Sequence, residues 1–336
     1  MFEGNNMTED LKKYLYQLLL KLSTEEKREI ISYLENSSYE SGNNLPAMIE
    51  EIRKKRFSSG YYCPHCSSSM VVRYGTYHGR QRYFCKNCRK TFTDITSTAL
   101  NFIHDKEKFI AVAGLMLSGF TLEETAEKVG ISIPTSFSWR HKVLNVLKNI
   151  EDEDLSGIVE ADDTFFLHSA KGSRNIGRKP RKRGGKSKKR GISSDQVCVL
   201  VARDRKNNTL SDIATFGRPS ADNIDRLLGT RISSNSVLLT DRHPSFSSFA
   251  KIRKLNYLPL DLGKGKRAIK GIYHIQNVNS YHSRLKNWIY RFKGVSTKYL
   301  SNYLHWFEFV DTVAKDKTRK AAERSLLLRA CSVRAV

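Results

Sequence analysis

Four cysteines form the pattern with the clearest chemical meaning in this chain. They make two Cys-x-x-Cys pairs with 18 residues between them: Cys63, Cys66, Cys85 and Cys88. Four thiolates at about 2.3 Å complete a closed tetrahedral zinc shell, so the spacing predicts a structural zinc site. Two disulfides are the alternative, but nothing else in the chain indicates a secreted protein. His65 and His78 are expected to lie near the full shell rather than in it.

A second group of polar residues could hold divalent cations. Asp162 lies in an expected strand, Asp241 ends another, and Asn279 lies near the start of an expected helix. Carboxylates at the ends of adjacent strands provide the hard oxygen ligands that Mg²⁺ prefers, and paired ions of this kind assist phosphoryl transfer. Lys286 lies two helical turns beyond Asn279 and faces the same way. Asp163 is the rival of Asp162, because neighbouring strand residues point to opposite faces.

Three further polar residues are candidates with weaker support. Glu160 shares the face of Asp162 and could support the cation ligands from outside. His243 and His282 could contact water or phosphate, although such histidines are more often ordinary surface or core residues. Aromatic residues at near-helical spacing are expected to pack the core rather than to stack on bases: Tyr299, Trp306, Phe307 and Phe309.

The charge of the chain indicates a polyanionic partner. The 336 residues carry a formal net charge of +24, with a pI near 9.8. Nucleic acid is the default partner of such a surface. The first 60 residues hold 9 basic and 10 acidic side chains, so the surplus lies beyond them. The longest apolar or glycine run, 109–117, is 9 residues, far below the roughly 18 that span a bilayer. The acidic start of the chain does not resemble a signal peptide, so a reducing cytoplasm is expected.

The first part of the chain reads as helical. Leucines and tyrosines recur with helical spacing over 11–22, and Ser23 with Glu26 predicts a capping box for a second helix. Residues 36–44 resemble a linker, and the pair of helices suits packing or self-association. After the cysteines, a helix is expected at 105–118. Thr121 and Glu124 then cap a short helix that Gly130 ends.

The helix that starts near Pro134 would complete a helix-turn-helix and read the major groove. Its polar side would be formed by Thr135, Ser136, Ser138, Arg140, His141 and Lys142. An ordinary helical hairpin is the alternative reading.

From Gly157 the pattern changes to alternating strands and helices. Strands are expected at 158–166, 196–203, 209–216, 236–240 and 257–260, and helices at 221–228, 245–255, 277–292 and 301–314. Three strands, then helix, strand, helix, strand, helix, is an α/β order with a mixed five-stranded sheet. The segment 171–190 interrupts this order with 11 Lys or Arg and no acid, and we expect it to clamp a nucleic-acid backbone.

Several of these segments together resemble bacterial insertion-sequence transposases of the zinc-ribbon, RNase H-like group. The resemblance covers roughly residues 60–312 and is carried by 63–93, 160–164, 240–244, 274–286, 294–300 and 302–307. It implies that Asp162, Asp241 and Asn279 form the catalytic metal triad, with Lys286 as its companion. It also implies a DNA transposase with Mg²⁺ or Mn²⁺ as catalytic cofactor and assembly into at least a dimer.

Asn279 stands where most members of such families carry Glu, although one branch of this family has Asn followed by Lys. An amide oxygen can bind Mg²⁺, but it is neutral and cannot act as a base. Metal affinity should fall unless another acid or the DNA phosphate compensates. Helix capping is the alternative role for Asn279. A non-catalytic DNA-binding regulator and a structure-specific nuclease of similar fold are the competing functions.

The expected organisation has five parts: a helical module (1–56), a zinc ribbon (57–100), a helix-turn-helix (101–150), an RNase H-like catalytic domain (151–316) with a basic insert (171–194), and a helical tail (317–336). The expected partners are double-stranded DNA of the element ends and the target, at the bacterial nucleoid. The DNA-contacting residues would be Thr135, Ser136, Arg140 and Lys142, with Arg178, Lys179, Arg181, Lys182, Arg183, Lys186, Lys188, Lys189 and Arg190 in the insert.

Overall fold

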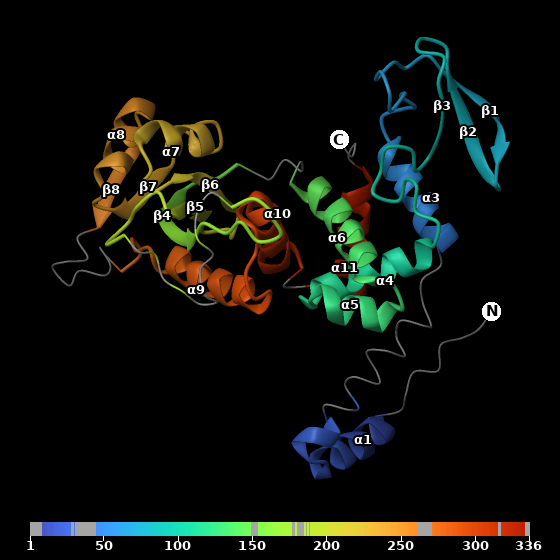
Figure 1. Ribbon diagram of the computed structural model, residues 1–336, viewed down its shortest axis with the longest axis horizontal. Coiled ribbons are helices and arrows are strands. Elements are labelled where there is room, and N and C mark those ends of the chain that lie inside the picture. The colour runs from blue at the N-terminus through green and yellow to red at the C-terminus, as the bar shows by residue number, and fades with distance from the viewer. Residues whose placement is uncertain are drawn as a thin grey trace. The chain divides into compact units, whose positions relative to one another are not determined.

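The computed structural model describes residues 9–27, 30, 45–148, 154–176, 179, 185, 187, 189–260, 271–314 and 317–332 (Figure 1). The chain divides into two compact units, 1–48 and 49–336. The helices are α1 (Glu9–Lys21), α3 (Leu45–Arg56), α4 (Lys106–Leu117), α5 (Leu122–Val129), α6 (Ile133–Leu147), α7 (Ala221–Leu228), α8 (Pro244–Arg253), α9 (Gln276–Arg291), α10 (Thr297–Glu308), the π-helix η2 (Phe309–Val313) and α11 (Arg319–Ser332). The strands are β1 (Val71–Tyr77), β2 (Arg80–Cys85), β3 (Thr91–Thr93), β4 (Ile158–Leu167), β5 (Gln196–Asp204), β6 (Thr209–Phe216), β7 (Val237–Asp241) and β8 (Asn256–Leu260).

The first unit contains α1 and the start of a second helix. The predicted capping box is confirmed, because the Ser23 N–H donates to the Glu26 carboxylate and the Glu26 N–H donates to the Ser23 hydroxyl. The side chains of Tyr16 and Leu20 are 66% and 79% exposed. Residues 31–44, which include the predicted linker, lie outside the described residues. No helix among the described residues is long and apolar enough to cross a membrane.

The second unit begins within α3 and continues with a three-stranded antiparallel sheet in the order β1-β2-β3. The first two strands lie between the two cysteine pairs. Strand β3 is only three residues long and pairs with β2 so that Tyr83 lies opposite Phe92. These two rings stack at 5.3 Å and both are buried, so the small sheet has its own apolar core.

Four helices, α4, α5, α6 and α11, form a helical region. The predicted caps of α5 are confirmed: Thr121 and Glu124 form a capping box, and Gly130 ends the helix at φ 64°, where glycine is favoured. Ser132 caps α6, with Pro134 in its first turn.

The C-terminal helix α11 belongs to this helical region. α11 packs against α4 and α6, and the Ala99 N–H donates to the Ala330 carbonyl oxygen. Leu326 and Leu327 are fully buried. The helical region is therefore completed by residues from the far end of the chain.

A mixed five-stranded sheet follows, as the sequence predicted, in the order β6-β5-β4-β7-β8. β5 runs antiparallel to β4 and β6, whereas β4, β7 and β8 run parallel to one another. Figure 1 shows α7 and α8 on one side of this sheet and α9 on the other. Alternate residues of each strand point to opposite faces of the sheet. Val159 and Leu238 belong to the core under α7 and α8, whereas Ile158 and Leu239 pack with Ile275 beside the start of α9.

A buried ion cluster joins the sheet to the helices on the α9 side. Arg203 of β5 donates to Asp311 of η2 at 2.7 Å, and both side chains are almost fully buried. Arg284 of α9 donates to both oxygens of the same carboxylate, at 2.7 and 2.8 Å. Burial alone would raise the pKa of Asp311, but the hydrogen bonds from Arg284 and Arg203 keep this pKa below its ordinary value.

We expect Asp311→Ala to lower the free energy of unfolding by about 3–5 kcal/mol, because two arginines lose their carboxylate and Arg203 stays buried. Urea unfolding at pH 7 measures the change. Glu127→Ala, at an exposed position on α5, is the control and should change the value by less than about 0.5 kcal/mol. The difference between wild type and Asp311→Ala should be complete above about pH 4, the unfolded pKa, and shrink as the pH falls through the lowered folded pKa. Equal unfolding curves would contradict this role.

Candidate catalytic and metal-binding sites

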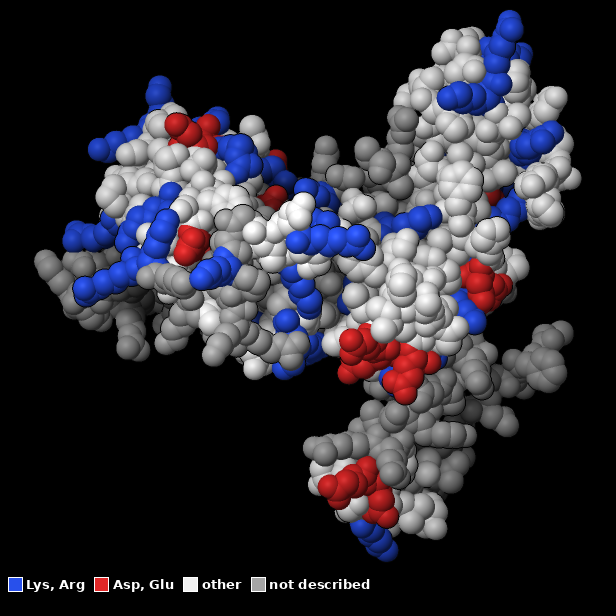
Figure 2. All heavy atoms as spheres, viewed as in Figure 1, with Lys and Arg blue, Asp and Glu red and all other residues white. Residues whose placement is uncertain are grey.

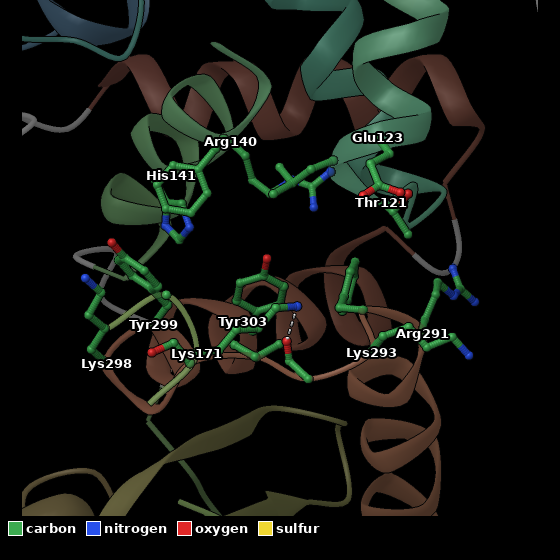
Figure 3. Close-up of a pocket in the computed structure, with 17 residues that line it drawn as sticks. Thr121, Glu123, Arg140, His141, Lys171, Arg291, Lys293, Lys298, Tyr299 and Tyr303 are labelled. Atoms are coloured by element: carbon green, nitrogen blue, oxygen red, sulfur yellow. Dashed lines mark hydrogen bonds between the residues drawn. The ribbon is translucent and has the colours of Figure 1, made fainter. Parts of the chain in front are cut away.

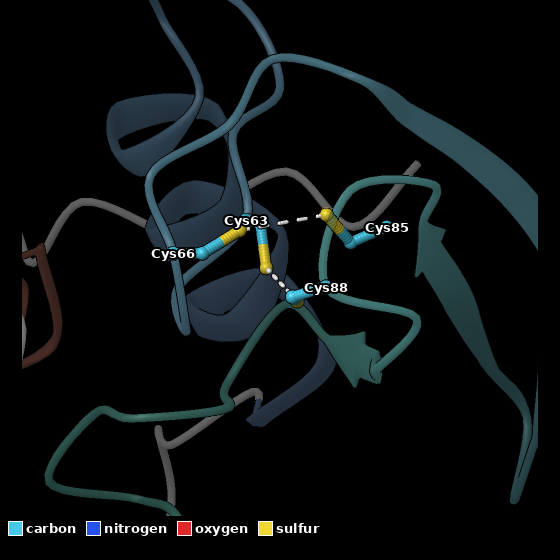
Figure 4. Close-up of side chains that lie close together, drawn as sticks. All are labelled: Cys63, Cys66, Cys85 and Cys88. Carbon is cyan, nitrogen blue, oxygen red and sulfur yellow. Dashed lines mark hydrogen bonds between the residues drawn. The ribbon is translucent and has the colours of Figure 1, made fainter.

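The four cysteines lie together at the base of the three-stranded sheet, held by two turns of the same form. The Cys63 N–H donates to the Ser68 carbonyl and the Ser67 N–H donates back to the Cys63 carbonyl. Cys85 makes the same pair of bonds with Lys90 and Arg89. In each turn the residue four beyond the first cysteine has positive φ, 59° at Ser67 and 56° at Arg89. Equivalent turns on two segments therefore present the sulfurs toward one point (Figure 4).

The sulfur distances fit one zinc ion and not disulfides. The Sγ atoms of Cys63 and Cys88 are 3.6 Å apart, as are those of Cys66 and Cys85, and all four lie within 4.8 Å of one another. A disulfide needs about 2.05 Å, whereas a tetrahedral shell with 2.3 Å bonds has edges of about 3.8 Å. The six cysteines are free thiols, so the disulfide alternative is wrong for this structure. His65 and His78 are not members of the cluster.

Asp162 and Asp241 are brought level by the register of two parallel strands. Glu160 of β4 pairs with Leu239 of β7, and the same register continued by two residues sets Asp162 beside Asp241. Neighbouring strands lie about 4.8 Å apart, and residues in parallel register share a face. That face is the one covered by α9, since His282 of α9 places its Nδ1 3.8 Å from the Asp162 carboxylate. Asp163 points to the opposite face.

The electrostatics of Asp162 favour a bound cation. Burial, together with the charges of Asp163 and Asp241, raises the pKa of Asp162 to about 7, and the charge of Lys286 opposes this rise. Burial and the charge of Asp241 also raise the pKa of Asp163. Crowded carboxylates of this kind hold their protons unless a cation compensates. Carboxylate oxygens are the donors that Mg²⁺ selects, so the residues fit that ion.

Asn279 and Lys286 lie on α9 as predicted, and both side chains are exposed. The α9 residue that lies against Asp162 is instead His282, which is 7% exposed. Burial first, and then the charge of Lys286, lowers the pKa of His282 to about 4, so this imidazole is neutral near pH 7. His282 was only a weak candidate in the sequence. The sequence signal for a role of His282 in the site was its position one helical turn beyond Asn279.

Glu160 holds the beginning of α9 on the sheet. Its carboxylate is fully buried and accepts hydrogen bonds from the backbone N–H groups of Asn277 and Val278, at 2.8 and 3.1 Å. The Asn277 side chain donates at 2.9 Å, and Arg205 forms an ion pair at 2.6 Å. The sequence offered Glu160 as an outer support of the metal ligands. The structure shows an anchor for the helix that carries Asn279.

His243 caps α8 beside Asp241. Its backbone N–H donates to the Asp241 carboxylate at 3.1 Å, and its Nε2 lies 3.4 Å from an Arg218 nitrogen. His243 therefore orients the end of β7, where Asp241 lies.

The residues proposed for groove reading on α6 need correction. Ser136 and Arg140 are 0% and 1% exposed, so neither reaches DNA in a groove. Lys142 donates to the Asn101 carbonyl at 2.6 Å, and burial lowers its pKa. Thr135 is half-buried next to the cap of α6. The reason is that α6 is covered on a second side by α10, whose Asn302 donates to Asn145 at 2.9 Å.

Of the predicted contacts in the basic insert, only Lys179, Lys189 and Arg190 belong to the described residues, and all three are exposed. The others lie outside them: Arg178, Arg181, Lys182, Arg183, Lys186 and Lys188. On the face drawn in Figure 2, Lys and Arg are spread widely over the five-stranded sheet and its helices, whereas Asp and Glu form small patches.

The part of the chain that contains the five-stranded sheet matches a known protein-family model. Residues 154–311 match the model of the ISXO2-like transposase domain. An uncharacterized protein in transposable element ISH50 of Halobacterium salinarum is 27% identical over 277 residues, which are 81% of this chain and 92% of that protein.

Two solved structures are distant matches. A pre-cleavage Mos1 transpososome is 13% identical, with 64% of this chain and 79% of that chain covered and a TM-score of 0.21. The Mos1 strand transfer complex is 12% identical, with 64% and 77% covered and a TM-score of 0.23. TM-scores at this level do not establish a common fold.

We expect the purified protein to carry about one zinc ion per chain and Cys85→Ser to lose it, because a buried thiolate of a closed shell is removed. Elemental analysis measures the metal, and Cys198→Ser, a buried cysteine in β5 outside the cluster, is the control that should keep it. Zinc retained in full by Cys85→Ser, or missing from the wild type, would refute the site.

We expect Asp162→Asn to stabilise the protein at pH 8 when Mg²⁺ is left out, because the folded wild type then holds a crowded, buried charge. The folded pKa of about 7 lies above the unfolded value near 3.9, so wild-type stability falls as the pH rises from about 4 to 7. Asparagine does not titrate, and the gap between the two proteins should widen over that window. Urea unfolding at pH 5 and pH 8 tests this, with exposed Asp222→Asn as control. A stability difference between the two proteins that does not change with pH would show that the Asp162 charge is not destabilised in the folded protein.

Proposed function

We propose that this protein is an active DNA transposase that cuts at insertion-sequence ends and joins them to target DNA, and the match of residues 154–311 to the ISXO2-like transposase domain supports this. The observation that carries the proposal is the register that sets Asp162 beside Asp241 on the α9 face of the sheet, inside the matched domain. The strand order β6-β5-β4-β7-β8, with β5 antiparallel, supports an RNase H-like catalytic domain.

Asp162 and Asp241 would hold Mg²⁺ or Mn²⁺ through carboxylate oxygens, with the Asn279 amide oxygen as a third ligand. Paired divalent cations activate an attacking oxygen and stabilise a leaving one. Lys286 would pair with a phosphate of the strand as a point charge. His282, neutral and buried, would keep the Asp162 carboxylate on the α9 side.

The reaction has two phosphoryl transfers. Water first attacks the phosphorus at the element end and the P–O3′ bond breaks, which leaves a 3′-hydroxyl and a 5′-phosphate. That 3′-hydroxyl then attacks a target phosphodiester, and the target's own 3′-oxygen leaves with a proton. Both steps exchange one phosphodiester oxygen for another, so a single pair of carboxylates serves both.

The remaining parts would bind DNA. The cysteine cluster and its three-stranded sheet form a zinc ribbon, and α5 and α6 form a helix-turn-helix whose exposed side bears Ser132, Thr135 and Ser138. The basic insert would follow the phosphate backbone. Two element ends must be held together during transposition, so the working form would contain at least two protomers.

A non-catalytic DNA-binding regulator is the second candidate. One observation favours it: the Asn279 side chain is neutral and exposed, while the α9 residue against Asp162 is His282. This candidate predicts sequence-specific binding of the element ends without nicking in Mg²⁺ or Mn²⁺.

We expect Asp162→Ala and Asp241→Ala each to lower strand transfer on the cognate ends by at least about 100-fold, since changes around metal ligands alone cost 10–100-fold. A gel assay of labelled ends joined to plasmid in Mg²⁺ measures this, and Asp222→Ala on α7 is the control. Asn279→Ala should shift the Mg²⁺ concentration for half-maximal rate less than either aspartate change does. Undiminished joining by Asp162→Ala protein would refute the catalytic assignment.

A further inference from the structure

A cavity of about 490 Å³ lies away from the candidate metal site, where α5 and α6 meet the turn between α9 and α10 (Figure 3). Cavities of about 300–1,000 Å³ are typical of small-ligand sites. The first residues of the basic insert also line it, because Lys171 donates to the Gly294 carbonyl at 3.0 Å. None of its lining residues belongs to the proposed metal triad.

The walls are strongly basic. Five cationic side chains line the cavity: Arg140, Lys171, Arg291, Lys293 and Lys298. One carboxylate, that of Glu123, lies among the lining residues. Such an excess of positive charge around a concave site concentrates anions.

Arg140 is a buried cation behind this wall. One of its terminal nitrogens donates to the Phe120 carbonyl at 2.7 Å and to the Thr125 hydroxyl at 3.2 Å. Its guanidinium also lies over the Trp306 and Phe292 rings, at 5.2 and 5.9 Å from their centroids. The side chain is only 1% exposed, so Arg140 adds positive charge to the cavity without opening its N–H groups to it.

Aromatic rings form the remainder of the cavity. The Tyr299 ring lies 4.3 Å from the His141 ring and 5.5 Å from that of Phe137. Burial, then the charges of Arg140 and Lys298, lowers the pKa of His141 to about 4, so this face is uncharged near pH 7. Figure 3 shows Tyr303 between this group and Arg140. Aromatic rings next to cationic side chains suit a ligand with an aromatic ring and a phosphate.

We propose that this cavity binds one nucleotide of single-stranded DNA, with its base stacked on Tyr299 and its phosphate paired with Lys298 and the neighbouring exposed cations. The inference rests on the proposed DNA substrate. A strand is favoured over a free nucleotide because the cavity lies at the end of α9, the helix that also bears Asn279 and Lys286 of the proposed metal site.

The test uses the full chain without added Mg²⁺ and two labelled single strands, oligothymidine and the same strand with abasic residues. Fluorescence anisotropy measures both affinities. The wild type should prefer the strand that has bases, and Tyr299→Ala should lower its affinity about tenfold while binding to the abasic strand stays unchanged. Tyr299→Phe keeps the ring and should keep the preference.

Charge variants test the phosphate contact. Lys298→Glu should weaken binding of both strands, and an acid in the first turn of α10 suits the helix dipole, so folding is preserved. Lys251→Glu on α8, across the five-stranded sheet from α9, is the matched control and should weaken binding less. Strands with 5-iodouracil should crosslink to Tyr299 on irradiation, as read by mass spectrometry.

Three results would overturn the inference: a base preference retained by Tyr299→Ala, crosslinks confined to residues outside the cavity, or full displacement of the strand by millimolar thymidine monophosphate. The last would show a site for free nucleotides. The binding assay requires no cleavage. Failed strand transfer with intact Tyr299-dependent binding therefore refutes only the proposed activity. Intact strand transfer without Tyr299-dependent binding refutes only this site.

Discussion

The arrangement of the candidate active site depends on the buried carboxylate of Glu160. A helix begins with backbone N–H groups that have no partner within the helix, and an anion placed there also meets the positive end of the helix dipole. The residue before α9, Ile275, gives no side-chain cap, so Glu160 supplies the acceptor from the sheet. Because the carboxylate is fully buried, its charge requires partners, and Arg205 together with the α9 amides provides them. One residue therefore fixes where α9 starts and how it faces β4.

This anchor is two residues from Asp162 on the same strand face, which explains why a crowded acid can be kept there. A carboxyl whose pKa is about 7 destabilises its surroundings when ionised, and flexible neighbours would turn it toward water. α9 cannot move freely, because Glu160 holds its first turn and Asp311 holds Arg284 two turns later. These two contacts therefore stabilise the helix that covers Asp162, where the proposed metal site would require negative charge.

The sequence predicted local structure well because the signals are local. The capping box of α5, Gly130 at its end, and strand β6 at 209–216 follow from adjacent residues. The pairing of Asp162 with Asp241 followed from strand order, since parallel neighbours end at the same edge. The role of His282 did not follow, because the rotation of α9 is set by Glu160, more than 100 residues earlier. Arg140 was misjudged for the same reason: helical periodicity gives a polar face, but α10 covers that face and lies about 160 residues further on.

Helix α10 packs against both the helical region and the five-stranded sheet. Asn302 bonds to α6, and the Trp306 indole donates to the Met116 carbonyl at 3.2 Å, while the same helix also packs on β6. Arg291, at the end of α9, donates to the Ser118 carbonyl between α4 and α5. Residues on both sides of position 150 therefore pack together, and residues 49–336 form one compact unit. A displacement of α5 and α6 would therefore also strain α10 and the end of α9, the helix that faces Asp162.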